Sequence, residues 1–172
     1  MTASMKWPEQ FLNWPSSYVS LPIEQVSDYP LLDAALKVWR DSATDGLPST
    51  LDPLDLPPAL IKGISLLFWD EDIEDWVIRL SATLLDDGYG RSMRGERMAN
   101  AFRADDAPVI RDAVKAVVDS GRPDLMRREY MDREGRVWSF VRLVLPLSSD
   151  GGKPDSYAFV IDPEAFGRRI DP

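Results

Sequence analysis

The sequence predicts an α+β fold, in which helices flank a β-sheet. Two observations predict it. Residues 31–39 and 110–118 carry apolar side chains at helical spacing, whereas residues 125–161 consist of extended apolar runs separated by turn residues. A shorter pair of extended runs precedes the second helix. Strands that cluster in this way, instead of alternating regularly with helices, are typical of α+β domains.

Residues 1–26 are predicted to form an N-terminal helical and aromatic arm. Trp7, Phe11, Trp14 and Tyr18 lie among prolines that interrupt any long helix. Exposure of these aromatic side chains to water would be unfavourable, so we expect them to cover the domain or a second subunit. A partly disordered leader is the alternative.

The first helix is expected to begin near Ser27 or Asp28, the candidate cap residues, with Pro30 in its first turn. Its apolar pattern ends by about residue 43, before Gly46. A proline-rich loop then enters a short helix near residues 57–62.

A β-hairpin is predicted from residues 64–69 and 76–80, two short apolar runs joined by the acidic segment DEDIED. A helical segment at residues 82–87 follows. It leads into the GYGRSMRG loop at residues 88–95, whose glycines favour positive φ angles.

The second long helix is expected to begin at Asp105 or Asp106 and to end at Gly121. Three strands follow, and the middle one, at residues 136–147, is apolar on both faces, so we expect it at the centre of the sheet. The domain is predicted to span residues 27–162, with a short C-terminal tail at residues 163–172.

The composition is that of a soluble globular domain. The 172 residues suffice for one core, and 44% of them are hydrophobic with a mean hydropathy of -0.25. No apolar run approaches the length of a membrane span and the first residues lack a signal-peptide pattern, so we expect a cytoplasmic protein without membrane contact. The net charge of -9 would repel nucleic acid, which we do not expect as a partner.

Cysteine and histidine are both absent, which excludes several kinds of chemistry. The chain cannot form a disulfide, a thiolate or imidazole metal site, a Ser-His-Asp triad, histidine-ligated haem or a cysteinyl-flavin adduct. The DEDIED turn lacks the glycine and the distal glutamate of a calcium loop. We therefore expect no enzyme activity, no metal and no cofactor, with a hydrolase or lyase that uses carboxylates as the alternative.

Three segments of the chain are similar to one known family. The first is LPSTLDPLDLPP at residues 47–58, which follows a Trp-Arg pair at the end of the first helix. The second comprises residues 79–95, and the third is LVLPLSSDGG at residues 143–152. They resemble the alphaproteobacterial PAS-like family, whose members carry approximately LPxxxDxDPLDLP, RLVGTALVEAFGRDLTG and LLLPLSDDGG at these places.

The resemblance implies a five-stranded antiparallel sheet flanked by helices, with two strands before the second long helix and three after it. The order of helices and strands predicted above from the residues agrees with this arrangement. In the second segment the family's glycine, aspartate and threonine are replaced by Ala82, Ser92 and Arg94, so what those side chains contribute does not carry over. No ligand is implied, because a fold does not by itself supply a site.

Candidate ligand-binding residues lie first around the glycine loop. Arg79, Thr83, Tyr89 and Arg91 place positive charge and hydrogen-bonding groups beside flexible backbone. In an acidic protein such a loop can bind an anionic metabolite or the acidic surface of a partner. Ordinary ion pairs within the loop are the alternative.

A second set of candidates lies in the last strands. Tyr130 and Trp138 are suited to lining a small-molecule cavity, with plain core packing as the alternative. Arg142 lies within an apolar strand, where an inward-facing guanidinium needs a carboxylate or a ligand as its partner. A structural ion pair is the simpler interpretation.

These observations predict a stand-alone PAS-like sensory or signalling domain that acts through non-covalent binding of a small anionic or apolar ligand, through protein contacts, or both. No kinase, cyclase or helix-turn-helix pattern accompanies it, so we expect its output to pass through a protein partner or a second copy in a homodimer. The alternative is an adaptor or dimerisation module whose core is filled and holds no ligand.

Overall fold

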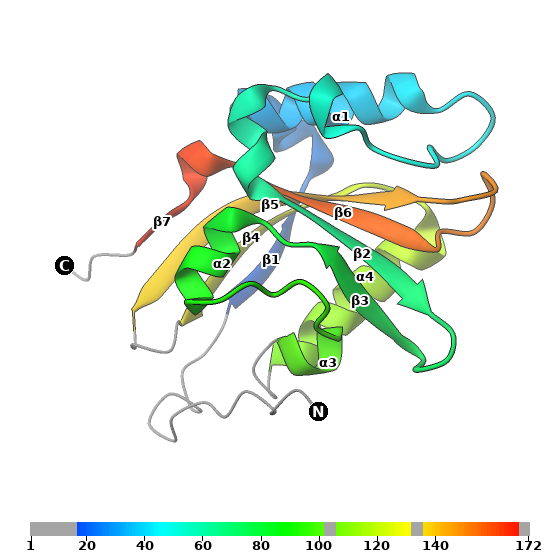
Figure 1. Ribbon diagram of the computed structural model, residues 1–172. Coiled ribbons are helices and arrows are strands. Elements are labelled where there is room, and N and C mark those ends of the chain that lie inside the picture. Colours follow the sequence, from blue (N-terminus) through cyan, green and yellow to red (C-terminus); the bar gives the residue numbers. More distant parts are fainter. Residues whose placement is uncertain (1–16, 102–105, 132–135, 169–172) are drawn as a thin grey trace.

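The computed structural model describes residues 17–101, 106–131 and 136–168 (Figure 1). Their centre is an antiparallel sheet of seven strands, six of them in the order β1-β4-β5-β6-β2-β3, with β7 paired to β5. The strands are β1 (Ser17–Leu21), β2 (Ile64–Asp70), β3 (Asp75–Leu80), β4 (Asp124–Met131), β5 (Val137–Leu147), β6 (Ser156–Ile161) and β7 (Gly167–Arg168).

Helices cover both faces of the sheet (Figure 1). None of the helices in the described ranges is both long and apolar enough to cross a membrane. The α-helices are α1 (Pro30–Ser42), α2 (Thr83–Tyr89), α3 (Met98–Ala101) and α4 (Asp106–Ser120), and the 3-10 helices are η2 (Ile23–Asp28), η3 (Pro53–Asp55), η4 (Pro58–Gly63) and η5 (Pro163–Ala165).

Helix α1 packs on one face of the sheet through the apolar stripe that the sequence shows. Leu32, Leu36 and Trp39 are buried, and the indole nitrogen of Trp39 donates to the backbone oxygen of Pro146 in β5 at 2.9 Å. The helix ends at Ser42, as predicted. The expected cap was wrong, because residues 23–28 form the 3-10 helix η2 and α1 therefore starts directly after it.

Helix α4 covers the opposite face. Of its predicted apolar positions Ala113 is only partly buried and the others are buried, and Ile110, Val114 and Val117 belong to the same core as Phe140 of β5. Gly121, with φ of 64°, ends the helix in the left-handed conformation that glycine adopts without steric cost. The predicted period and end of this helix are therefore confirmed.

Strand β5 lies in the middle of the sheet, as its apolar character on both faces predicted. It pairs with β4 on one side and with β6 on the other. Successive side chains of a strand point to opposite faces, so Val141 and Leu143 pack in the α1 core and Phe140 and Val144 in the α4 core. Arg142 falls on the α4 face by the same alternation.

The expectation of five strands was wrong, because β1 and β7 also join the sheet. Strand β1 comes from the part of the chain that was expected to be an aromatic arm, and it pairs with β4 from Ser17 opposite Glu129 to Leu21 opposite Leu125. Strand β7 pairs with Trp138 and Ser139 of β5, beyond the part of β5 that pairs with β6. Both are short edge strands, whose extended form depends on pairing with distant residues. Trp7, Phe11 and Trp14 lie outside the described residues.

The segment between the hairpin and α4 is organised as predicted, with one addition. The hairpin consists of β2 and β3, and helix α2 follows it. Gly90 and Gly95 have φ of 69° and 87°, which confirms the expected positive angles in the glycine loop. The short helix α3 was not predicted. Residues 133–135, which connect β4 to β5, lie outside the described residues.

Candidate functional site

The α4 face of the sheet contains a buried arginine. The side chain of Arg142 is 1% exposed, and its Nε donates to Sδ of Met126 at 3.0 Å. Its Nη2 donates to the hydroxyl of Tyr18 in β1 at 2.8 Å. Among the described residues no carboxylate lies within ion-pair distance of it. The expected structural ion pair of Arg142 is therefore absent from the described part of the chain.

Aromatic rings take the place of a carboxylate. Cζ of Arg142 lies 3.8 Å from the ring centroid of Phe159, 5.5 Å from that of Tyr18 and 5.8 Å from that of Phe140. A cation over an aromatic face is attracted to the ring, most strongly where water is excluded. These contacts offset part of the cost of burying the charge, which therefore persists in the core.

A second polar group on this face lacks a conventional partner. Tyr157 in β6 is fully buried, and its hydroxyl oxygen has no hydrogen-bond partner among the described residues. Its ring packs edge-on against Trp76 and Phe159, with centroids 4.7 and 4.9 Å away. Burial raises the pKa of Tyr157 well above its usual range, although the charge of Arg142 lowers it.

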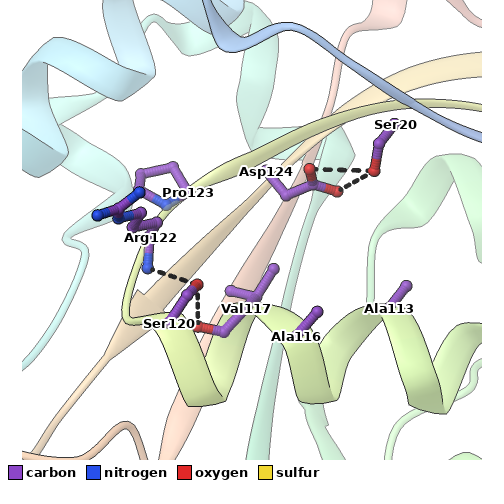
Figure 2. Close-up of a pocket in the computed structure, with 8 residues that line it drawn as sticks. All are labelled: Ser20, Ala113, Ala116, Val117, Ser120, Arg122, Pro123 and Asp124. Atoms are coloured by element: carbon purple, nitrogen blue, oxygen red, sulfur yellow. Dashed lines mark hydrogen bonds between the residues drawn. The ribbon is translucent and has the colours of Figure 1, made fainter.

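A small cavity lies beside this cluster, between α4 and the edge formed by β1 and β4 (Figure 2). Its volume is about 140 Å³. The small side chains of Ala113 and Ala116 form the α4 wall, and the hydroxyl of Ser20 donates to both carboxylate oxygens of Asp124 at 3.2 Å on the opposite wall. Arg122 also lines the cavity.

The electrostatics of the cavity connect it to the buried arginine. Burial raises the pKa of the Asp124 carboxyl, and the hydrogen bond from Ser20 and the charge of Arg142 offset part of that rise. Asp124 therefore takes up a proton more readily than a solvated aspartate. We refer to Tyr18, Asp124, Met126, Arg142 and Phe159, together with this cavity, as the arginine site.

One strand candidate of the sequence lies on the face that carries Arg142. This is Trp138 of β5, whose register partner in β4 is Tyr130. Trp138 is half-buried and stacks on Phe166 with centroids 5.3 Å apart. The side chain of Tyr130 lies outside the described residues.

The loop candidates lie elsewhere, around the end of β3 and α2. Arg79 is exposed, and its Cζ lies 6.0 Å from the ring centroid of Phe68. Thr83 is exposed at the start of α2, and the side chain of Tyr89 lies outside the described residues. Arg91 donates to the carboxylate of Glu96 at 2.8 Å, the type of loop ion pair weighed as the alternative.

Sequence reasoning missed several residues of the arginine site. Tyr157 and Phe159 occupy alternate positions of a predicted strand, which was enough to place both on one face. Asp124 was left just outside the predicted strand. Tyr18 was expected only to cover the domain or a second subunit as part of the aromatic arm. Its bond to Arg142 was not predicted, because it depends on β1, whose pairing joins residues more than a hundred positions apart.

Comparison with known proteins gives a family for most of the chain. The model of the PAS domain family matches residues 32–161. No curated protein matches the chain. Among solved structures, one described as an RNA-binding light-oxygen-voltage receptor is similar, with 17% sequence identity and a TM-score of 0.43. The match covers 69% of this chain and 36% of that structure.

Proposed function

The chain belongs to the PAS domain family, and from this premise we propose that it is a sensory domain that binds a small organic anion non-covalently at the arginine site. The observation that carries the proposal is the buried guanidinium of Arg142, which lacks a carboxylate partner among the described residues. An anion supplies the charge that such a group otherwise misses. The family supports a sensory or signalling role, and the site supports the ligand class.

We place the ligand in the cavity between α4 and the β1–β4 edge. Arg142 does not line this cavity, but its charge acts on Asp124, which does. The cavity volume of about 140 Å³ suits a short-chain carboxylic acid, not a bulky cofactor. The guanidinium of Arg122, which lines the cavity, has no ion-pair partner within the described ranges. A ligand carboxylate in the cavity therefore lies beside Arg122 in the lining and near Asp124, on which the charge of Arg142 also acts.

Asp124 makes binding of an anion dependent on pH. When this carboxyl is ionised it repels an anionic ligand, and when it is protonated it donates a hydrogen bond instead. Because burial raises its pKa, protonation occurs at a higher pH than for a solvated aspartate. We expect the affinity for the anion to rise as pH falls and binding to be accompanied by proton uptake.

We expect the domain to pass on its signal through contacts between its surface and another protein chain. Tyr18 and Ser20 of β1 both touch the arginine site, and β1 forms an edge of the sheet. A ligand that changes these contacts changes the position of this edge strand, where a partner protein or a second copy can pair with its backbone. The proposal includes no catalytic step, and the homodimer stays a prediction.

One observation favours the alternative, an adaptor module without a ligand. The rings of Phe159, Tyr18 and Phe140 already surround the guanidinium of Arg142, and two hydrogen bonds occupy its nitrogens. In this case the cluster is a structural element of the core. The function then lies entirely in the surface of the domain.

Calorimetric titration with acetate, lactate and succinate, together with mass spectrometry of small molecules released on denaturation, tests the proposal. We expect one of these acids, or a retained acid, to bind the wild type and not Arg142→Met. The matched control Arg40→Gln removes an exposed arginine on α1 and should bind as the wild type does. If no acid binds or is released, the ligand proposal fails and the adaptor interpretation stands.

A further inference from the structure

A second and larger groove lies on the other side of α4. Its volume is about 460 Å³, and it is enclosed by α4, the β2–β3 hairpin and the loop between β5 and β6. None of the residues that line it lines the cavity of the arginine site. A volume of this size lies within the range of roughly 300 to 1,000 Å³ that is usual for small-molecule sites.

Two tryptophans form the apolar part of this groove, which we call the tryptophan groove. Trp69 and Trp76 are opposite each other in the hairpin, with ring centroids 5.4 Å apart and planes at 70°. Trp76 is buried and rests on Tyr157, whereas Trp69 is 38% exposed. Because the two tryptophans are already held against each other, a planar ligand can pack on the exposed indole without the side chains first becoming ordered.

The cations of the groove are only partly neutralised. Lys115 of α4 forms an ion pair with Asp119 one turn later. Arg111, one turn earlier on the same side of the helix, and Lys153 in the β5–β6 loop have no ion-pair partner within the described ranges. Two cations without a carboxylate partner within those ranges therefore share the groove with a tryptophan that is partly exposed.

Two nearby acids keep their charge but accept hydrogen bonds within the loop, and they form no ion pair with Arg111 or Lys153 among the described residues. Asp150 accepts from the backbone nitrogen of Gly152 at 2.8 Å and from the hydroxyl of Ser148 at 2.9 Å. Asp155 accepts from the backbone nitrogen of Ser149 at 3.1 Å. Glu71 is the fourth acid of the lining, beside Asp119, which pairs with Lys115. Within the described part of the chain, four acids and three cations therefore line the groove, and binding of an anion depends on the local placement of Arg111 and Lys153.

We infer that the tryptophan groove binds a planar aromatic carboxylate, whose ring packs on Trp69 and whose carboxylate is held by Arg111 and Lys153. Arginine holds a carboxylate through parallel hydrogen bonds, and lysine adds a second charge. The backbone nitrogen of Trp69 donates to the oxygen of Asp155 at 2.9 Å, which ties the hairpin to the loop that carries Lys153. The site is thus assembled before the ligand arrives.

Calorimetric titration of the full chain tests this inference with three probes of similar size: phenylacetate, benzyl alcohol and benzylamine. We expect phenylacetate to bind most tightly, because only it satisfies both cations. The double variant Arg111→Gln/Lys153→Gln should bind it at least about tenfold more weakly, the loss expected for one charge-assisted hydrogen bond. Trp69→Ala should weaken binding of phenylacetate as well.

The matched control is Lys37→Gln/Lys62→Gln, which removes the same charge from exposed positions on the opposite face of the sheet and should bind phenylacetate as the wild type does. Arg142→Met should also leave this binding unchanged, so the groove and the arginine site are tested separately. Tighter binding of benzylamine than of phenylacetate overturns the inference. So does a lack of phenylacetate binding, or equal affinity of the two double variants.

Discussion

The guanidinium of Arg142 shows how a charge persists in an apolar core without an ion pair. Its Cζ lies over the ring of Phe159, 3.8 Å from the centroid, while two of its nitrogens donate to Tyr18 and Met126. A flat, delocalised cation is suited to contacting a ring face and donating from several nitrogens at the same time. Lysine, with a compact ammonium group, satisfies only one of the two.

Arg142→Lys should therefore lower the free energy of unfolding by about 2 kcal/mol, because a buried charge is kept while its stacking and hydrogen bonds are lost. Arg142→Met should cost less, since it removes the charge itself and fills similar space. Urea denaturation of both variants measures the difference. A lysine variant more stable than the methionine variant contradicts this account of the site.

Tyr157→Phe should raise the free energy of unfolding by about 1 kcal/mol, because a buried hydroxyl without a hydrogen-bond partner is removed and the ring contacts stay. Tyr29→Phe is the matched control: its hydroxyl accepts from Arg127 at 3.3 Å near the surface, so its removal should not stabilise the protein. Destabilisation by Tyr157→Phe, measured by urea denaturation, would show that the hydroxyl has a favourable partner.

The raised pKa of Asp124 predicts that the free energy of unfolding depends on pH. Burial raises its folded-state pKa above the usual 3.8, so the folded state holds the proton more tightly than the unfolded state does. The stability of the wild type relative to Asp124→Asn should be highest below the unfolded-state pKa and should fall as pH rises through the folded-state pKa. Thermal unfolding of both proteins across this range measures the difference.

At the level of elements, the long helices were predicted from their sequence pattern, whereas the edge strands were not. Helices α1 and α4 have apolar positions three and four residues apart, a signal contained within each segment. Strands β1 and β7 have five and two residues, and each becomes extended by pairing with residues far along the chain. Short segments of this kind carry too little internal pattern to be recognised.

Removal of residues 1–21 should destabilise the domain markedly, because it takes away β1, exposes the edge of β4 and breaks the contacts of Tyr18 with Arg142 and of Ser20 with Asp124. Removal of residues 1–16 is the matched control, since it leaves every contact described here in place. Urea denaturation of both truncated proteins compares them. Equal stability would mean that β1 adds little to the sheet.

At the level of the whole molecule, the charge decides which large partners are attracted. The net charge of -9 repels a phosphate backbone at long range. We expect no binding of single- or double-stranded RNA at physiological salt, measured by filter binding. Saturable binding would contradict this and would point to a local basic surface strong enough to overcome the overall charge.

The sequence by itself determined the types of the main elements, the central place of β5, the family, and the exclusion of chemistry that needs cysteine or histidine. These properties follow from local periodicity, from conspicuous segments and from composition, none of which requires knowledge of distant contacts. Even the face on which Arg142 lies follows from the alternation of its strand.

The tertiary structure alone decided what surrounds that arginine. Its partners Tyr18 and Phe159 come from strands that reach β5 through the order of the sheet, and Tyr18 is 124 positions away. The separation of the arginine site from the tryptophan groove likewise depends on where α4 lies across the strands. Register and packing between distant segments are set by the free energy of the whole fold, so short-range patterns do not contain them.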